Sequence, residues 1–162
     1  MKINKFIFDL DRTIWDTYDA TGRPIWAKQM LPPYQKDGDM IIDDVGSYCV
    51  LRKGFKQYIL ELSEKNAEIG FISVGAIKNY NDKLQPSIAM LKIFGIYDLF
   101  NAEKVLVYKE ESKLNYLKKC EVCYYFDDDK KHLDVAAKIS DVTEFDSKKI
   151  IDWKLFNEQA RL

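Results

Sequence analysis

Two carboxylates and a hydroxyl follow a short apolar run near the N-terminus, and together they could bind a cation and a phosphate. Asp9 and Asp11 come directly after the apolar residues 6–8, and Thr13 lies two positions further on. The apolar run predicts a buried strand that ends at the two carboxylates. Buried carboxylates are costly unless a positive charge offsets them. We expect Mg²⁺ here, because it takes oxygen ligands and keeps positions open for phosphate oxygens.

The same carboxylates allow a second role and a simpler explanation. Asp9 could attack phosphorus, because a carboxylate nucleophile forms an aspartyl-phosphate. A single acidic residue after an apolar run often only marks the turn that ends a strand. The full string Asp-x-Asp-x-Thr, from Asp9 to Thr13, is much more restrictive. It resembles the first motif of the haloacid dehalogenase-like phosphatases, and the next residues, Ile14-Trp15, resemble the magnesium-dependent phosphatase-1 subgroup.

The elements that would position these residues alternate between strand and helix. We expect a helix at 55–62, a strand at 69–73, helical residues at 76–94 with a break before Pro86, a strand at 105–107, a helix at 112–119, a strand at 122–126, a helix at 133–137, an edge strand at 143–145 and a terminal helix at 151–160. This order predicts an α/β fold with a doubly wound, Rossmann-like parallel sheet and helices on both faces. Ligands bind beyond the carboxyl ends of such strands.

Polar residues follow two further predicted strands. Ser73 can donate a hydrogen bond to a phosphate oxygen, and Gly75 lets the backbone approach closely. Three acidic residues, 127–129, follow the strand at 122–126. Asp129 is expected to cap the next helix, and the three carboxylates repel one another without a cation. A serine at a strand end is also a common helix cap, so Ser73 alone decides little.

The order of these residues resembles the remaining motifs of the same phosphatase family. Ser73 matches the second motif, and Asp127-Asp128 resemble the paired aspartates of the fourth. The third motif is a lysine, for which Lys113 is our choice and Lys109 the reserve, although most lysines are simply solvated. The family motifs cover residues 4 to about 138.

The resemblance implies a mechanism and a set of site residues. Asp9 would be the nucleophile and Asp11 the general acid and base. Thr13, Ser73 and Lys113 would complete the catalytic set. The resemblance places Mg²⁺ on Asp9, Asp127 and the backbone carbonyl of Asp11, with Asp128 as the partner of Asp127. Substrate contacts are expected from the residues beside the first two motifs, Arg12, Trp15, Ser73, Val74 and Gly75.

The stretch from about 16 to 50 does not follow the alternation. Glycines and prolines interrupt it repeatedly, and it carries several aromatic residues. Residues 40–42 and 48–51 predict a β-hairpin. Since the stretch leaves the first strand at its carboxylate end, we expect a small β-hairpin flap over the site. The intervals after Asp11 and Ser73 are too short for a large cap domain.

Length and composition exclude several classes of function. The 162 residues predict one domain, 1–162, with a net charge of −1 that favours neither nucleic acid nor a membrane surface. The sequence has no apolar run of the roughly 18 residues that a membrane helix needs. The sequence has only three cysteines. The spacing of Cys120 and Cys123 would suit a zinc half-site or a redox pair, but small buried thiols in a cytoplasmic protein are the more typical explanation.

We therefore expect a Mg²⁺-dependent phosphatase that hydrolyses phosphate monoesters. The substrate could be a phosphoprotein or a small ester such as a sugar phosphate. The alternatives are a receiver-like domain and a catalytically silent phosphate-binding module on the same fold. In a receiver domain the metal-binding acid pair follows the first strand and the phosphorylated Asp ends a central one, whereas here the strand at 69–73 ends in Ser73.

Overall fold

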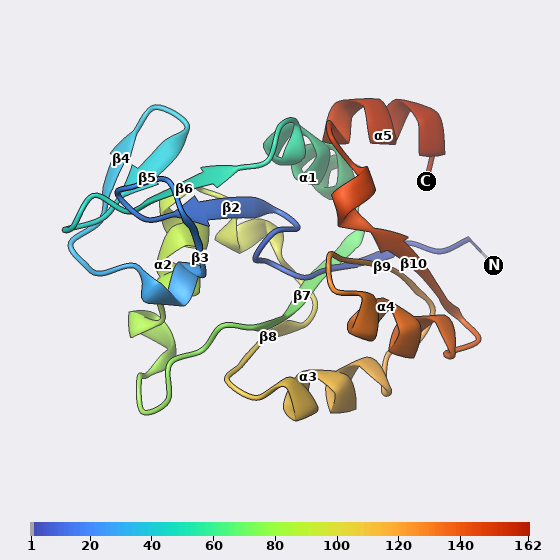
Figure 1. Cartoon of the computed structure of the whole chain (residues 1–162). Coiled ribbons are helices and arrows are strands. Elements are labelled where there is room, and N and C mark those ends of the chain that lie inside the picture. The colour runs from blue at the N-terminus through green and yellow to red at the C-terminus, as the bar shows by residue number, and fades with distance from the viewer. Residues whose placement is uncertain (1) are drawn as a thin grey trace.

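The computed structural model describes residues 2–162, and its centre is a five-stranded parallel sheet in the order β10-β9-β1-β7-β8 (Figure 1). The strands are β1 (Lys5–Phe8), β7 (Glu68–Val74), β8 (Lys104–Val107), β9 (Cys123–Asp127) and β10 (Val142–Asp146). β1 is central and pairs in parallel with β7 and β9. The predicted parallel α/β sheet is confirmed, and its carboxyl edge brings together the ends of strands far apart in sequence.

Helices cover both faces of this sheet, as the alternation of apolar residues requires. Phe6 and Phe8 belong to one hydrophobic cluster and Ile7 to another, because successive side chains of a strand point to opposite faces. Figure 1 shows helices on both sides of the sheet. They are α1 (Phe55–Glu64) and α5 (Trp153–Ala160) on the first face, and α3 (Glu110–Leu117) and α4 (Lys130–Ala137) on the second. None of the helices within residues 2–162 is both long and apolar enough to cross a bilayer.

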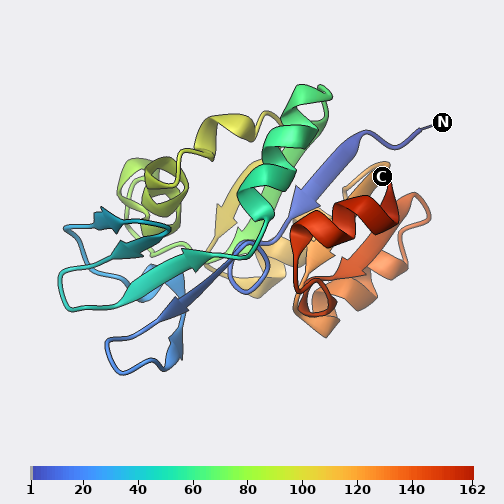
Figure 2. The same cartoon turned by 90° about the horizontal axis from the view of Figure 1, so that it is seen from above.

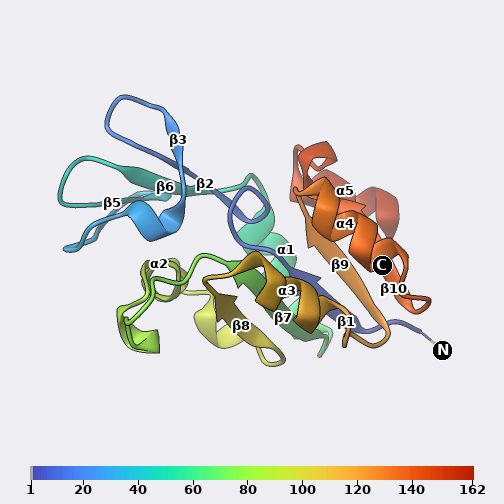
Figure 3. The ribbon, with the colours of Figure 1, turned by 60° about the horizontal axis from the view of Figure 1, so that its bottom comes forward.

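Residues 15–51 form a separate antiparallel sheet in the order β3-β2-β6-β5-β4, which lies beside the parallel sheet (Figures 2 and 3). Its strands are β2 (Trp15–Tyr18), β3 (Pro24–Ile25), β4 (Gln35–Asp37), β5 (Met40–Ile42) and β6 (Tyr48–Leu51). The predicted hairpin is confirmed, with Ile41 opposite Cys49. The expectation of only a small hairpin was wrong, because β2 also pairs with β6 through contacts distant in sequence.

The prediction of helix from residue 76 onward was wrong in its first half. α2 (Pro86–Ile93) begins only at Pro86, and residues 76–85 form a loop with a short 3₁₀ turn, Asp82–Leu84. The Gln85 side chain holds this loop by accepting a hydrogen bond from the Ile77 amide at 2.7 Å and donating one to its carbonyl at 3.0 Å. Asn79 has a φ of +68°, in the left-handed region, so a right-handed helix cannot continue through this residue. The remaining predicted elements are confirmed to within a few residues.

The C-terminal helix is fastened to the start of α1 by a close backbone contact. The Trp153 amide donates a hydrogen bond to the Lys53 carbonyl at 3.0 Å. Gly54, the N-cap of α1, has a φ of +78°. A Cβ added there would lie 2.8 Å from the Lys154 amide nitrogen and 2.8 Å from Asp152 Oδ1. Position 54 therefore requires glycine both for its conformation and for the space that α5 occupies.

Replacing Gly54 by alanine should reduce the free energy of unfolding through both effects. Gly22→Ala is a matched control, because Gly22 has a φ of +86° but no atom within 4 Å of an added Cβ. Gly54→Ala should cost at least about 1 kcal/mol more than Gly22→Ala, since only the first overpacks a filled site. Urea denaturation of both variants measures the difference, and equal losses would show that α5 does not pack against position 54.

Candidate active site

Four side chains from distant parts of the sequence meet at the carboxyl edge of the parallel sheet. Asp9 Oδ1 accepts hydrogen bonds from Ser73 Oγ at 2.9 Å and from Lys113 Nζ at 3.1 Å. The same ammonium lies 2.7 Å from Asp127 Oδ2. All four residues are buried, with Lys113 only 1% exposed. The strand ends supply Asp9, Ser73 and Asp127, and α3 supplies the lysine from the second face.

The structure distinguishes between the two candidate lysines. Lys113 lies on the buried side of α3, whereas Lys109 is exposed and its ammonium lies 5.9 Å from the centre of the Tyr108 ring. Burial alone would lower the pKa of Lys113, but the carboxylates of Asp9 and Asp127 outweigh that effect and raise it. Lys113 is therefore a fixed positive charge between two carboxylates.

Carboxyl groups outnumber cations in this cluster, because Asp9, Asp127 and Asp128 share a single lysine. Burial raises the pKa of Asp9 well above its usual range, and the nearby charge of Asp127 adds to the effect. The pKa of Asp128 is also raised, first by burial and then by Asp127. Carboxylate oxygens of these three residues lie within 4.8 Å of one another. One lysine cannot balance this set, whose oxygen donors fit a hard divalent cation such as Mg²⁺.

Asp127 is held by more donors than the sequence suggested. Its Oδ2 accepts hydrogen bonds from Lys113, from the Tyr125 hydroxyl and, at 3.0 Å, from His132 Nδ1. Its Oδ1 accepts one from the Asp129 amide at 2.9 Å. Burial raises the pKa of Asp127, but the hydrogen bond to His132 and the charge of Lys113 together hold it below its usual range. Asp127 is thus an ionised anchor with both oxygens already engaged.

A cavity of about 300 Å³ opens in front of these residues. Its walls are formed by Asp9, Asp11, Trp26, Lys28, Val74, Glu110, Lys113, Asp128, Asp129 and His132. Asp128, and not Asp127, belongs to this wall, so the half-buried member of the acidic pair is the one that faces the cavity. Trp26 and Lys28 come from the segment at 15–51, which therefore lies against the cavity as we expected of a flap.

Asp11 also faces the cavity, and Trp15 positions it. Asp11 Oδ1 accepts hydrogen bonds from Trp15 Nε1 at 3.0 Å and from the Ala27 amide at 3.1 Å. Burial raises the pKa of Asp11, although these two hydrogen bonds lower it. Trp15, which we expected to contact substrate, does not line the cavity, and its side chain is completely buried in the hydrophobic core.

Of the other residues predicted beside the first two motifs, some line the cavity and others hold the lining residues in place. Val74 lines the cavity, and the space at Gly75, where a Cβ would lie 3.6 Å from Asp11 Oδ2, borders it. The Arg12 guanidinium lies 4.0 Å from the centre of the Trp26 ring, which makes Arg12 a support for that wall. Thr13 is wholly buried and shares a hydrogen bond of 3.0 Å with Ser147, so its hydroxyl fixes the turn and does not reach the cavity.

Sequence reasoning did not identify Tyr125 and His132. A signal for each was present. Tyr125 lies two residues before Asp127 on the same strand, so both side chains point to one face of the sheet. His132 follows the capping Asp129 by three residues, which places both on one side of α4. The distance from His132 to Glu110 of α3 depended on helix packing and had no signal in the sequence.

Comparison with known proteins finds little similarity. No family model matches the chain, and no curated protein matches it. Among solved structures, the chain is similar to the crystal structure of an uncharacterized protein from Listeria monocytogenes serotype 4b, with 16% sequence identity and a TM-score of 0.47. The match covers 76% of this chain and 66% of that protein, so this chain spans less than two thirds of its length. A similarity of this size identifies neither a family nor a function.

Proposed function

We propose that this protein is a Mg²⁺-dependent phosphatase of the haloacid dehalogenase-like type, which hydrolyses phosphate monoesters through an aspartyl-phosphate on Asp9. The observation that carries the proposal is the arrangement around Asp9. A serine hydroxyl and a buried ammonium both donate to Asp9 Oδ1, at 2.9 and 3.1 Å, beside a cavity that Asp9 lines. These are the groups that a phosphoryl group would need next to a carboxylate nucleophile.

The positive charge of Lys113 favours the approach of an anionic substrate to an anionic nucleophile. In the first step a carboxylate oxygen of Asp9 forms a bond to phosphorus, and the bond from phosphorus to the leaving oxygen breaks. Ser73 and Lys113 can donate to phosphoryl oxygens as negative charge builds on them. Their burial fixes both donors before the reaction, so little reorganisation is required.

Asp11 supplies and removes the proton. Burial raises the pKa of Asp11, which favours the protonated acid needed in the first step. That proton passes to the leaving oxygen. The resulting Asp11 carboxylate then takes a proton from a water molecule, whose oxygen attacks phosphorus and displaces Asp9. Phosphate leaves, and both aspartates return to their starting states.

Asp9 and Asp128, both on the cavity wall, would hold Mg²⁺ with Asp127 beside them. When bound, the ion supplies positive charge that offsets the carboxylates and the phosphate. From the sequence we expected Asp127 to be the metal ligand and Asp128 its partner. The proposal exchanges these roles, because Asp127 already accepts hydrogen bonds on both oxygens. A catalytically silent phosphate-binding module could use the same residues, and hydrolysis assays separate the two proposals. Phosphoproteins and small phosphate esters both remain candidate substrates.

Removing divalent metal should abolish hydrolysis of an aryl phosphate, and added Mg²⁺ should restore it. Asp128→Asn should raise the Mg²⁺ concentration needed for half-maximal activity by about 10–100-fold, since it removes a charged ligand from the cavity wall. Asp134→Asn is the matched control, because Asp134 is an exposed acid of α4 that does not line the cavity. Full turnover in chelator would contradict the proposal, as would equal effects of the two variants.

Substituting the two aspartates of the first motif should have different consequences. Asp9→Asn removes the nucleophile, so no phosphoenzyme should form. Asp11→Asn keeps the nucleophile and should lower turnover of alkyl phosphates by about 10²–10⁴-fold, because their leaving group needs a proton. With a good aryl leaving group the first step should proceed, and the phosphoenzyme should accumulate because water lacks its base.

Rapid-quench mass spectrometry measures this accumulation and identifies the phosphorylated peptide. The phosphoryl group should map to the peptide that contains Asp9. Asp44→Asn, at an exposed acid of the antiparallel sheet segment, should behave like the wild type. Phosphorylation near Asp127, or wild-type turnover by Asp9→Asn, would show that the nucleophile is misassigned.

A further inference from the structure

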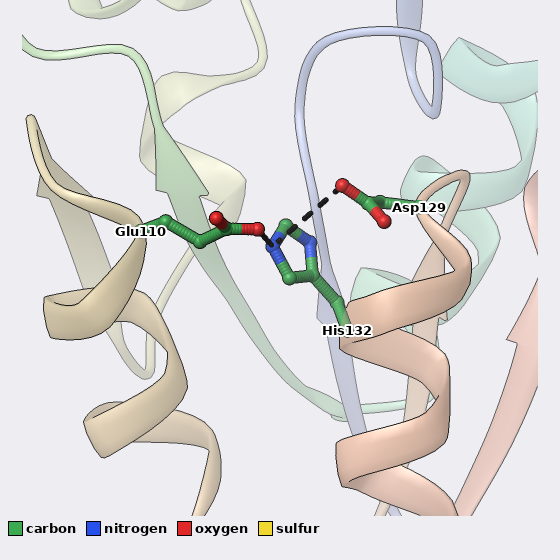
Figure 4. Close-up of side chains that lie close together, drawn as sticks. All are labelled: Glu110, Asp129 and His132. Atoms are coloured by element: carbon green, nitrogen blue, oxygen red, sulfur yellow. Dashed lines mark hydrogen bonds and ion pairs between the residues drawn. The ribbon is translucent and has the colours of Figure 1, made fainter.

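Three potential metal ligands from two helices meet at the edge of the cavity, outside the cluster around Asp9. Glu110 is the first residue of α3, Asp129 is the N-cap of α4, and His132 lies in the first turn of α4. Figure 4 shows the two carboxylates directed toward the same edge of the imidazole ring. One ligand atom of each residue lies within 4.8 Å of the others. None of the three has a part in the proposed phosphatase reaction.

The separations between these atoms are those of a nearly formed metal site. His132 Nε2 lies 3.2 Å from Glu110 Oε1 and 3.9 Å from Asp129 Oδ2. Nitrogen and oxygen ligands bind Zn²⁺ at about 2.0–2.2 Å, which in a tetrahedron separates neighbouring ligand atoms by about 3.3–3.6 Å. Small rotations of two half-exposed carboxylates would therefore complete the geometry.

The orientation of His132 is the second observation. Its Nδ1 lies 3.0 Å from Asp127 Oδ2, a carboxylate oxygen that can only accept, so Nδ1 carries a hydrogen and donates it. In the neutral ring this leaves the lone pair of Nε2 directed at two further carboxylates. His132 is 6% exposed, so little water can satisfy that nitrogen. A carboxylate that orients an imidazole in this way is the usual support of a metal-binding histidine.

We propose that Glu110, Asp129 and His132 bind a transition-metal ion, Zn²⁺ or one of similar preference, at the mouth of the cavity. The imidazole nitrogen selects Zn²⁺ over Mg²⁺, which prefers oxygen ligands only. Glu110 and Asp129 retain 45% and 41% exposure of their side chains, so an ion can reach them from solvent. Three protein ligands leave a fourth position, and all three ligands line the cavity. A ligand in the cavity could occupy that position.

Cobalt binding to the full, metal-free chain tests this site without any measurement of activity. Millimolar Mg²⁺ is present throughout to saturate oxygen-only sites. We expect one equivalent of Co²⁺ to bind with the strong visible absorption of tetrahedral coordination, and Zn²⁺ to displace it. Glu110→Gln should weaken Co²⁺ binding by at least about tenfold, because it removes a charged ligand. Glu111→Gln, the same change at the next, exposed position of α3, should leave binding unaltered.

Each of the other outcomes would overturn the proposal. No Co²⁺ binding would mean that Glu110, Asp129 and His132 contact only one another and hold no ion. Equal weakening by Glu110→Gln and Glu111→Gln would mean general electrostatic attraction. Binding that Asp9→Asn abolishes but Glu110→Gln does not would place the ion in the neighbouring carboxylate cluster. A thiolate absorption band lost in Cys120→Ser would place it on the cysteines. Failure of the phosphatase proposal would leave all of these readouts unchanged.

Discussion

The buried ammonium of Lys113 is the interaction on which the carboxyl edge of the parallel sheet depends. It lies 3.1 Å from Asp9 and 2.7 Å from Asp127, which follow or end the adjacent strands β1 and β9. Without it, two buried carboxylates would lie close together without the ammonium between them, and removing one partner of a buried ion pair typically costs about 3–5 kcal/mol. The same contact fastens α3 to the sheet. Charge and helix position are therefore determined together.

Asp127 extends this network to His132, on another wall of the cavity. One of its oxygens accepts from Lys113, Tyr125 and His132 at once. The carboxylate that helps to fix the lysine beside Asp9 also fixes the imidazole that faces Glu110. The two proposed metal sites would then share a hydrogen-bonded support but no ligand, which is why substitutions at Asp9 and Glu110 can separate them.

The segment that forms the antiparallel sheet holds Asp11 in place and forms part of the cavity wall. Trp15, buried in the core, holds the carboxylate of Asp11 through its indole nitrogen. Trp26 and Lys28 form part of the cavity wall, and Arg12 stacks on the Trp26 ring. The segment between Asp11 and α1 thus both orients and covers the carboxylate of Asp11, the proposed general acid and base.

The sequence by itself determined the alternation of strands and helices, and with it the meeting of Asp9, Ser73 and Asp127, because the carboxyl ends of parallel strands lie at one edge. The tertiary structure decided what depends on packing between elements. It selected Lys113 over Lys109 through the face that α3 buries, and it placed Trp15 in the core. It also brought Glu110 to His132. Local periodicity describes one element at a time, whereas these contacts join residues of different elements, whose distance only the packed chain determines.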